Sequence, residues 1–336
     1  MPVIAANETR VVVAGQGVVG LTTACCLATR GWSVEIWSIE ERRPSSYAAC
    51  ALFLPYFGTA ESPKTERWSR ASWQRFSHIA EDDSSGVRAI RMMEMFGKAT
   101  TVPVVLRDLT LVDSYRRDDL PQGFSYVWDF ATWLIDVPIY VSYLMRLCLE
   151  SGVKFESRMC TRDSVHQRSV AAVIDCTGHW SSCEFDAEDV KPVRGQAVVL
   201  PSIPLDFALG GDEFILAPRS DGLIFGSLWQ EGDRSDKARD VDTRRLLDEL
   251  GSWCSAPLLD QFGLRSNASD VRAVLTGVRP YLESGDFVRV DAPVNGWGPV
   301  IHNTGHGGSG VGLSWGTAEE VGTLLASLVG GPSRRG

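Results

Sequence analysis

The sequence lacks the marks of several protein classes. Its eight cysteines form no C-x-x-C pair and no zinc-like Cys/His spacing, so we expect no metal site and reduced, mostly buried thiols. No run of Lys and Arg could follow a phosphate backbone, and the formal net charge is −9, which argues against a nucleic-acid partner. No apolar run approaches the roughly 18 residues of a membrane span, and no secretory signal is recognisable. We therefore expect a cytoplasmic protein without a membrane partner.

The first forty residues instead have the pattern of a nucleotide-binding strand, turn, helix and strand. Residues 10–14 read RVVVA, a run typical of a buried strand, and lead into the turn Gly15-Gln16-Gly17-Val18-Val19-Gly20. In such a turn, Gly15 permits the tight bend, Gly17 lets a pyrophosphate approach the backbone, and Gly20 lets the helix pack on the strand. The pattern predicts a dinucleotide site but does not by itself distinguish FAD from NAD.

The acidic residue that usually contacts the ribose about 20 positions after this turn is not in its place. Ser38 stands at the end of the second strand, and Glu40 follows two residues later. Arg42 or Arg43 would suit a 2′-phosphate. The ribose contact therefore stays open between Ser38 and Glu40.

Pieces of the same domain recur along the chain. Residues 170–175 read VAAVID, and residues 300–302 look like a short strand before the glycine cluster at 305–310. The regions between these pieces contain alternating runs typical of antiparallel strands. We predict an α/β fold with an α+β second domain. A Rossmann-like FAD-binding domain is assembled from residues 1–55, 138–190 and 291–330, a mainly antiparallel β-sheet substrate domain from 56–137 and 191–290, and a flexible tail from 331–336.

Four blocks make the chain similar to the D-amino-acid oxidase family, which includes D-aspartate oxidase. They are VVVAGQGVVGLTTACCLATRG from Val11, AACALFLPY at 48–56, DCTGHW with VRGQ between 175 and 196, and TGVRP with VIHNTGHGGSGVGLSWG between 276 and 316. The resemblance implies an FAD domain interleaved with a substrate domain. It also implies hydride transfer from Cα of a D-amino acid to flavin N5, which gives an imino acid and then a 2-oxo acid and ammonia. Oxygen would reoxidise the flavin and form hydrogen peroxide.

The resemblance assigns roles to individual residues. Arg279 would bind the substrate carboxylate, a task suited to a planar guanidinium that is always charged. Gly308 would accept the substrate amino group at its backbone carbonyl, and Leu52 would place its N–H near flavin N5 and C4. The expected cofactor contacts are Gly15, Gly17, Val18, Val19, Gly20, Ser38 or Glu40, Ser45, Ser46, Ala49, Ala51, Leu52, Cys160, Thr177, Gly178, Gly307, Gly308, Ser309, Gly310, Val311 and Gly312.

The positions that would set specificity depart from the family. Phe214 stands where the family has a tyrosine that also contacts the carboxylate, a loss of about 1–3 kcal/mol. Trp229 occupies the position at which D-aspartate oxidases have an arginine that binds the side-chain carboxylate. Leu54 occupies a position that is often polar in the family. The segment LGGDEF is too short for a long mobile lid. With Tyr56, these residues predict an apolar, aromatic pocket and a neutral or aromatic substrate.

Two other functions stay open from the sequence. An amine or imino-acid oxidase, or a dehydrogenase of a specialised metabolite, is compatible with the hydroxyl missing at Phe214. An inert FAD-binding protein is disfavoured by Arg279 and the glycine cluster. His179 and His306 have no second metal ligand at suitable spacing, so we expect them to be structural. The expected partners are an amino acid or amine and molecular oxygen, and a homodimer is left open.

Overall fold

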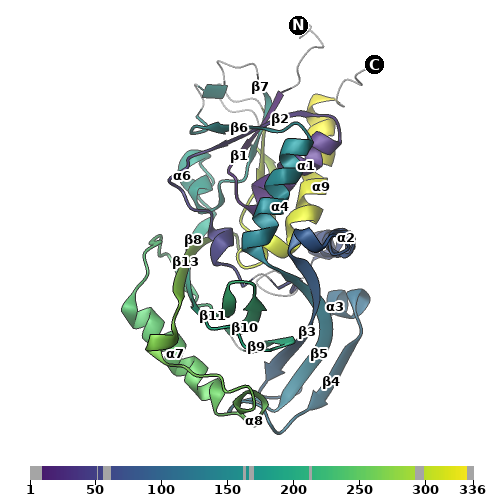
Figure 1. Cartoon of the computed structure of the whole chain (residues 1–336). Coiled ribbons are helices and arrows are strands. Elements are labelled where there is room, and N and C mark those ends of the chain that lie inside the picture. Colours follow the sequence, from purple (N-terminus) through teal and green to yellow (C-terminus); the bar gives the residue numbers. More distant parts are fainter. Residues whose placement is uncertain are drawn as a thin grey trace, which may run out of the picture.

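The computed structural model describes residues 10–50, 52–55, 62–161, 164–165, 170–211, 214–291 and 299–330. Ala51, Tyr56 and the expected tail at 331–336 lie outside these ranges. The described chain forms a six-stranded sheet that is mostly parallel and a nine-stranded sheet that is mainly antiparallel (Figure 1). The predicted α/β architecture with its antiparallel second sheet is therefore confirmed.

The six-stranded sheet has the order β14-β15-β7-β1-β2-β6. Neighbouring strands are parallel except at the edge, where β14 runs antiparallel to β15. Its strands come from three separated segments of the chain, as the sequence predicted. The strands are β1 (Arg10–Ala14), β2 (Ser33–Ser38), β6 (Lys154–Ser157), β7 (Val170–Asp175), β14 (Val288–Asp291) and β15 (Val300–Asn303).

Strand β1 is central to this sheet and is covered on both faces. Val11 and Val13 belong to one apolar core, which they share with the helices α1 (Val18–Thr29), α4 (Val137–Glu150) and α9 (Gly310–Val329). Val12 points to the other face and packs with Trp37 in a smaller cluster. The β-branched run that predicted a buried strand thus supplies side chains to both layers, as parallel sheets require.

The nine-stranded sheet has the order β12-β8-β11-β10-β9-β3-β5-β4, and β13 pairs with β8 as well. All its pairs are antiparallel except β3 with β9. In Figure 1, α7 and α8 lie along the outer side of this sheet. The elements are β3 (Val87–Phe96), β4 (Val112–Arg116), β5 (Tyr126–Ile135), β8 (Lys191–Leu200), β9 (Phe207–Gly211), β10 (Phe214–Arg219), β11 (Gly222–Gly226), β12 (Gln230–Glu231), β13 (Ala273–Tyr281), α3 (Val104–Leu109), α7 (Asp240–Cys254) and α8 (Pro257–Asp260).

Helix α2 departs from the expected division of the chain. It spans Pro63–Ile79, within the segment expected for the substrate domain, yet Trp68, Phe76 and Ile79 belong to the core that covers the parallel sheet. The expected boundary near residue 291 also falls inside strand β14. The exact domain boundaries stay a prediction. The remaining short helices are η1 (Ser45–Ala48), η2 (Asp83–Ser85), η3 (Gly178–Trp180), α6 (Ser181–Glu184) and η4 (Ala268–Asp270).

Helices α2 and α9 approach each other closely at Gly316. A Cβ on Gly316 would lie 2.7 Å from the carbonyl carbon of Trp68, which real side chains do not tolerate. The Gly316 N–H donates to Ser72 Oγ at 2.9 Å, and Trp68 Nε1 donates to Glu320 Oε2 at 2.6 Å. Contact between the two backbones thus fixes α2 against the helix that leads away from the glycine cluster.

We predict that Gly316→Ala destabilises the protein by about 1–3 kcal/mol, because the added methyl group overpacks two helices. Gly322→Ala in the same helix is the matched control. Its methyl group would meet the flexible guanidinium of Arg30 and would gain helix propensity, about 1 kcal/mol. Thermal unfolding measured by circular dichroism checks both variants, and equal melting temperatures would contradict the packing argument.

Candidate functional site

One elongated cavity joins the parts of the chain that the sequence picked out. It passes from the turn after β1, past the end of β2 and η1, to the ends of β7 and β13 and the start of α9. Most of the residues expected to touch a cofactor or substrate line it: Gly15, Gly17, Val19, Ser38, Ser45, Ser46, Ala49, Leu52, Leu54, Cys160, Thr177, Gly178, Arg279, Gly307, Gly308, Ser309, Gly310, Val311 and Gly312. Segments far apart in sequence therefore form one site.

The glycine turn lies where no side chain fits. Gly15 has φ +104°, and a Cβ there would lie 2.9 Å from the carbonyl carbon of Cys176. A Cβ on Gly20 would lie 2.9 Å from the carbonyl carbon of Gly15. The turn is held by the Gly15 N–H, which donates to the Trp37 carbonyl at 2.8 Å. These contacts explain Gly15 and Gly20, while Gly17 lines the cavity.

Two helix N-termini meet the cavity. Helix α1 begins at Val18 and α9 at Gly310, and the first N–H groups of a helix have no partner within it and carry partial positive charge. Such ends suit anionic groups, so the walls fit an elongated dinucleotide such as FAD. Val18 and Gly20 are not among the lining residues, so their expected contacts with the cofactor stay a prediction. Val18 donates its N–H to Ser46 Oγ at 3.1 Å, and Gly20 serves helix packing.

The charged lining residues are four arginines and one glutamate, namely Arg42, Arg43, Arg158, Arg279 and Glu184. This balance is opposite in sign to the chain's net charge of −9. Arg42 pairs with Glu184, and its Cζ lies 4.1 Å from the ring centre of Trp180. Such a cavity favours a ligand that is negatively charged at both ends.

The cavity near the end of β2 bears on the ribose contact that the sequence left open. Ser38 lines it, whereas Glu40 is exposed in the following turn and does not. The geometry therefore favours Ser38 over Glu40 as a ribose contact. Arg158, whose Cζ lies 4.4 Å from the ring centre of Trp37, was missed by the sequence reasoning. The sequence feature that could have indicated this residue is an arginine directly after a strand of the parallel sheet.

At the other end of the cavity, Arg279 is the charged residue. Its Nη1 donates to the carbonyl of Leu228 at 3.0 Å, and its Nη2 donates to Ser227 Oγ. The guanidinium lies over Gly195, where a Cβ would be 2.8 Å from Cζ. Trp229 is stacked on the same group, with its ring centre 5.5 Å from Cζ. The charge is thus held in a fixed place in the wall.

The structure corrects the expected pocket at Phe214. This side chain stacks on Phe225 with ring centroids 5.5 Å apart, in the core on the opposite face of β10. Its neighbour Ile215 lines the cavity, because successive side chains of a strand point to opposite faces. Trp229 also does not line the cavity and packs edge-on against Tyr281. The apolar wall near Arg279 is formed by Ile215, Leu52, Leu54 and Cys50.

The histidines and thiols of the cavity stay uncharged at neutral pH. Burial lowers the pKa of His306 to about 3. Burial, followed by the nearby charges of Arg234 and Arg42, lowers the pKa of His179 to about 4. Burial raises the pKa of Cys50 to about 11 and that of Cys160 to about 12.

Within the described ranges, no group of three His, Cys, Asp or Glu residues is placed to hold a metal. No helix in the described part of the chain could span a bilayer.

An Asp–His–Asp chain, in which Asp175 and His302 are buried and Asp291 is exposed, supports the wall at Thr177, and the sequence reasoning missed it. Asp175 Oδ1 accepts from the Thr177 N–H at 3.0 Å and from its hydroxyl at 2.7 Å. His302 contacts Asp175 with Nδ1 at 2.8 Å and Asp291 with Nε2 at 2.9 Å. Burial acts to raise the pKa of Asp175, but the bond and charge of His302 outweigh it and lower the pKa. Burial acts to lower the pKa of His302, but both carboxylates outweigh it and raise the pKa. The chain is therefore an ion pair across three strands.

We predict that this pair makes stability depend on pH. The raised pKa of His302 stabilises the fold fully below about pH 6.5, and this contribution is lost as pH rises through the folded-state pKa. The lowered pKa of Asp175 also stabilises the fold. This contribution is fully present above about pH 3.9 and is lost as pH falls through the folded-state pKa. In His302→Gln, the decline of melting temperature on the alkaline side should be reduced. Parallel pH profiles for the wild type and the variant would rule this out.

Comparison with known proteins agrees with this site. The chain matches the sequence model of the family described as FAD dependent oxidoreductase over residues 10–324. It is 28% identical to a D-amino-acid oxidase of Rubrobacter xylanophilus over 331 residues, 95% of this chain and 97% of that protein. It is 27% identical to a D-amino-acid oxidase of Schizosaccharomyces pombe, over 92% of this chain and 93% of that protein.

A glycine oxidase from Bacillus cereus has a similar structure, with a TM-score of 0.70 and 18% identity over 98% of this chain and 99% of that one. At this identity the likeness shows the fold alone. The family match spans nearly the whole chain, and the resemblance inferred from the sequence is thereby confirmed. The chain belongs to the D-amino-acid oxidase family of FAD-dependent oxidoreductases, with FAD as its cofactor and amino compounds as its electron donors.

Proposed function

We propose that the protein oxidises a D-amino acid with a neutral or aromatic side chain. The observation that carries the proposal is Arg279, held by Ser227 and Leu228 in the wall of a cavity that Ile215, Leu52 and Leu54 also line. A carboxylate bound there would gain charge-assisted, bidentate hydrogen bonds in a site of low dielectric. We assign Arg279 to the carboxylate of the substrate.

The wall beside Arg279 supports a neutral substrate side chain. Ile215, Leu52 and Leu54 contribute only apolar side chains there. The other arginines of the described walls already have partners, since Arg42 pairs with Glu184, Arg43 lies over the ring of Tyr47 and Arg158 over the ring of Trp37. A second carboxylate would be buried without a cation, which is costly. An acidic D-amino acid should therefore be a poor substrate.

The residues of this end act by binding and orienting. Bound FAD supplies the acceptor for the hydride from Cα, and we propose molecular oxygen as the final acceptor with hydrogen peroxide as product. Gly308 is proposed to accept the amino group at its carbonyl, and Leu52 to present its N–H to the cofactor. The bridge between Leu52 and Leu134 fixes that backbone against the antiparallel sheet. His306 and Cys50 are neutral at pH 7, so they contribute walls rather than proton transfer.

A second function has one observation in its favour. Ile215 carries no hydroxyl, so the carboxylate would rest on Arg279 without a hydroxyl partner from β10. An amine or imino-acid oxidase would need the carboxylate less. Reduction of the flavin by secondary amines or cyclic imino acids, and not by primary D-amino acids, would favour this alternative.

We predict that Arg279→Ala loses about 100-fold or more in kcat/KM for D-phenylalanine, because the carboxylate loses its charged partner. Arg279→Lys should lose less, since it keeps the charge but not the planar fork. Both variants should remain yellow with bound FAD. Anaerobic mixing with D-phenylalanine, D-leucine, D-aspartate and L-phenylalanine, followed by the bleaching of the flavin, measures these effects.

Two results would count against the proposal. If D-phenylalanine reduced the flavin of Arg279→Ala as fast as that of the wild type, the role assigned to Arg279 would be contradicted. If D-aspartate and D-phenylalanine reduced the flavin of the wild type equally, the proposed apolar pocket would be contradicted, while the proposed class of reaction would stand.

A further inference from the structure

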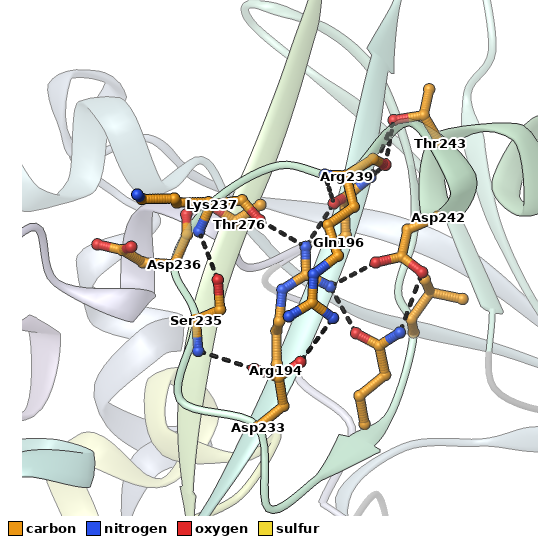
Figure 2. Close-up of polar contacts among 12 residues, drawn as sticks. Arg194, Gln196, Asp233, Ser235, Asp236, Lys237, Arg239, Asp242, Thr243 and Thr276 are labelled. Atoms are coloured by element: carbon orange, nitrogen blue, oxygen red, sulfur yellow. Dashed lines mark hydrogen bonds and ion pairs between the residues drawn. The ribbon is translucent and has the colours of Figure 1, made fainter.

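Arg194 is a fully buried arginine of β8 that does not line the cavity. Its Nη1 donates to Asp242 Oδ2 at 2.7 Å and also to Gln230 Oε1. Its Nη2 donates to Gln196 Oε1 at 2.6 Å and to the carbonyl of Lys237 at 2.7 Å (Figure 2). Taking such a charge out of water costs several kcal/mol, and a buried ion pair is weak evidence for net stability. A role in fixing geometry is the better explanation.

The network of Arg194 fastens the segment 227–239, which connects β11 to helix α7 and contains the short strand β12. Gln196 accepts from the Arg239 N–H at 2.9 Å and donates to the Arg239 carbonyl at 3.0 Å. Figure 2 shows the segment wrapped over Arg194, with Thr276 of β13 donating to the carbonyl of Asp236. The segment is therefore tied to β8 and β13 at several points along its length.

The same segment begins with the residues that hold Arg279. Leu228 and Ser227 accept from its guanidinium, and Trp229 stacks on it. The next residue is Gln230, whose Nε2 donates to Asp242 Oδ1 at 3.0 Å while its Oε1 accepts from Arg194. Gln230 thus joins the buried ion pair to the peptide that holds Arg279.

We propose that Arg194, Asp242 and Gln230 are positioning residues for substrate recognition: they fix residues 227–229 and, through them, the guanidinium of Arg279. The inference rests on the proposed role of Arg279 in binding a carboxylate. A misplacement of about 1 Å in a binding group is enough to lower activity by about 100-fold. A rigid support behind such a group is what precise recognition requires.

Gln230→Ala tests the inference because it leaves the Arg194–Asp242 pair in place. Gln230→Met is the second variant, of similar length but without polar atoms. Loss of hydrogen bonds to charged groups should raise KM for D-phenylalanine and Kd for benzoate by about 5–30-fold. The kcat should fall less than KM rises, and the FAD spectrum should be retained. Benzoate serves as the carboxylate probe, and its binding is followed by the change in the flavin spectrum.

Thr243→Ala is the matched control, since it removes two bonds on the helix side and none to residues 227–230: the bond from Gln196 Nε2, 2.9 Å long, and the bond from Thr243 Oγ1 to the Arg239 carbonyl, 3.3 Å long. Its KM and benzoate Kd should stay within about twofold of the wild type, which is at most about 0.4 kcal/mol. Melting temperatures of all variants separate stability from recognition, because a purely structural role would move the melting temperature without moving KM.

Arg279→Ala, measured beside these variants, separates the two proposals. If it loses benzoate binding while both Gln230 variants keep wild-type KM and Kd, the positioning role is overturned and the carboxylate site stands. If Arg279→Ala itself keeps benzoate binding, the proposed function fails. Failure of both Gln230 variants to fold would show that the network acts on stability, which also overturns the inference.

Discussion

The antiparallel pairing of β8 with β13 is the constraint on which the substrate end of the site depends. It places Gly195 opposite Gly277 and leaves the guanidinium of Arg279 lying over Gly195. Gly277 also lets β13 approach η1, because a Cβ there would lie 3.2 Å from the carbonyl oxygen of Ser45. The same pair of strands thus fixes the arginine of the substrate sheet and closes the cavity that holds the cofactor. A side chain at Gly195 would meet the guanidinium of Arg279, and one at Gly277 would press on η1.

Electrostatics follows from the same arrangement. The protein is acidic as a whole, yet the walls of the cavity carry four arginines against one glutamate. Helix N-termini at Val18 and Gly310 add partial positive charge near the middle of the cavity. The histidines and thiols lining the cavity are kept neutral by burial. An anionic cofactor and an anionic substrate group therefore meet a cavity of opposite charge with few groups able to exchange protons.

The parallel sheet and the glycine turn could be predicted from the sequence because their causes are local. Gly15 has φ +104°, a Cβ on Gly20 would clash with Gly15 in the same turn, and the run of β-branched residues that forms β1 is continuous in the sequence. The position of Arg279 came from resemblance to a family, and the structure places it in the cavity wall. Predicting these features requires little information about contacts between distant segments of the chain.

The parts that could not be predicted depend on register and on long-range contacts. A shift of one residue reverses the face of a strand, so Phe214 packs in the core while Ile215 lines the cavity. Spacing alone could not decide whether Ser38 or Glu40 contacts the ribose. The networks of Arg194 and His302 join positions 48 and 127 residues apart in the chain, to Asp242 and Asp175 respectively. Such pairings appear only once the strands are placed side by side.

A crystal structure of the FAD-loaded protein with benzoate bound tests the role of Arg279 most directly. We predict that the carboxylate is bound by the guanidinium of Arg279 and that the aromatic ring packs against Ile215 and Leu54. Arg279 should keep its contacts to Leu228 and Ser227. A carboxylate bound elsewhere, or an Arg279 turned away from the cavity, would contradict this role.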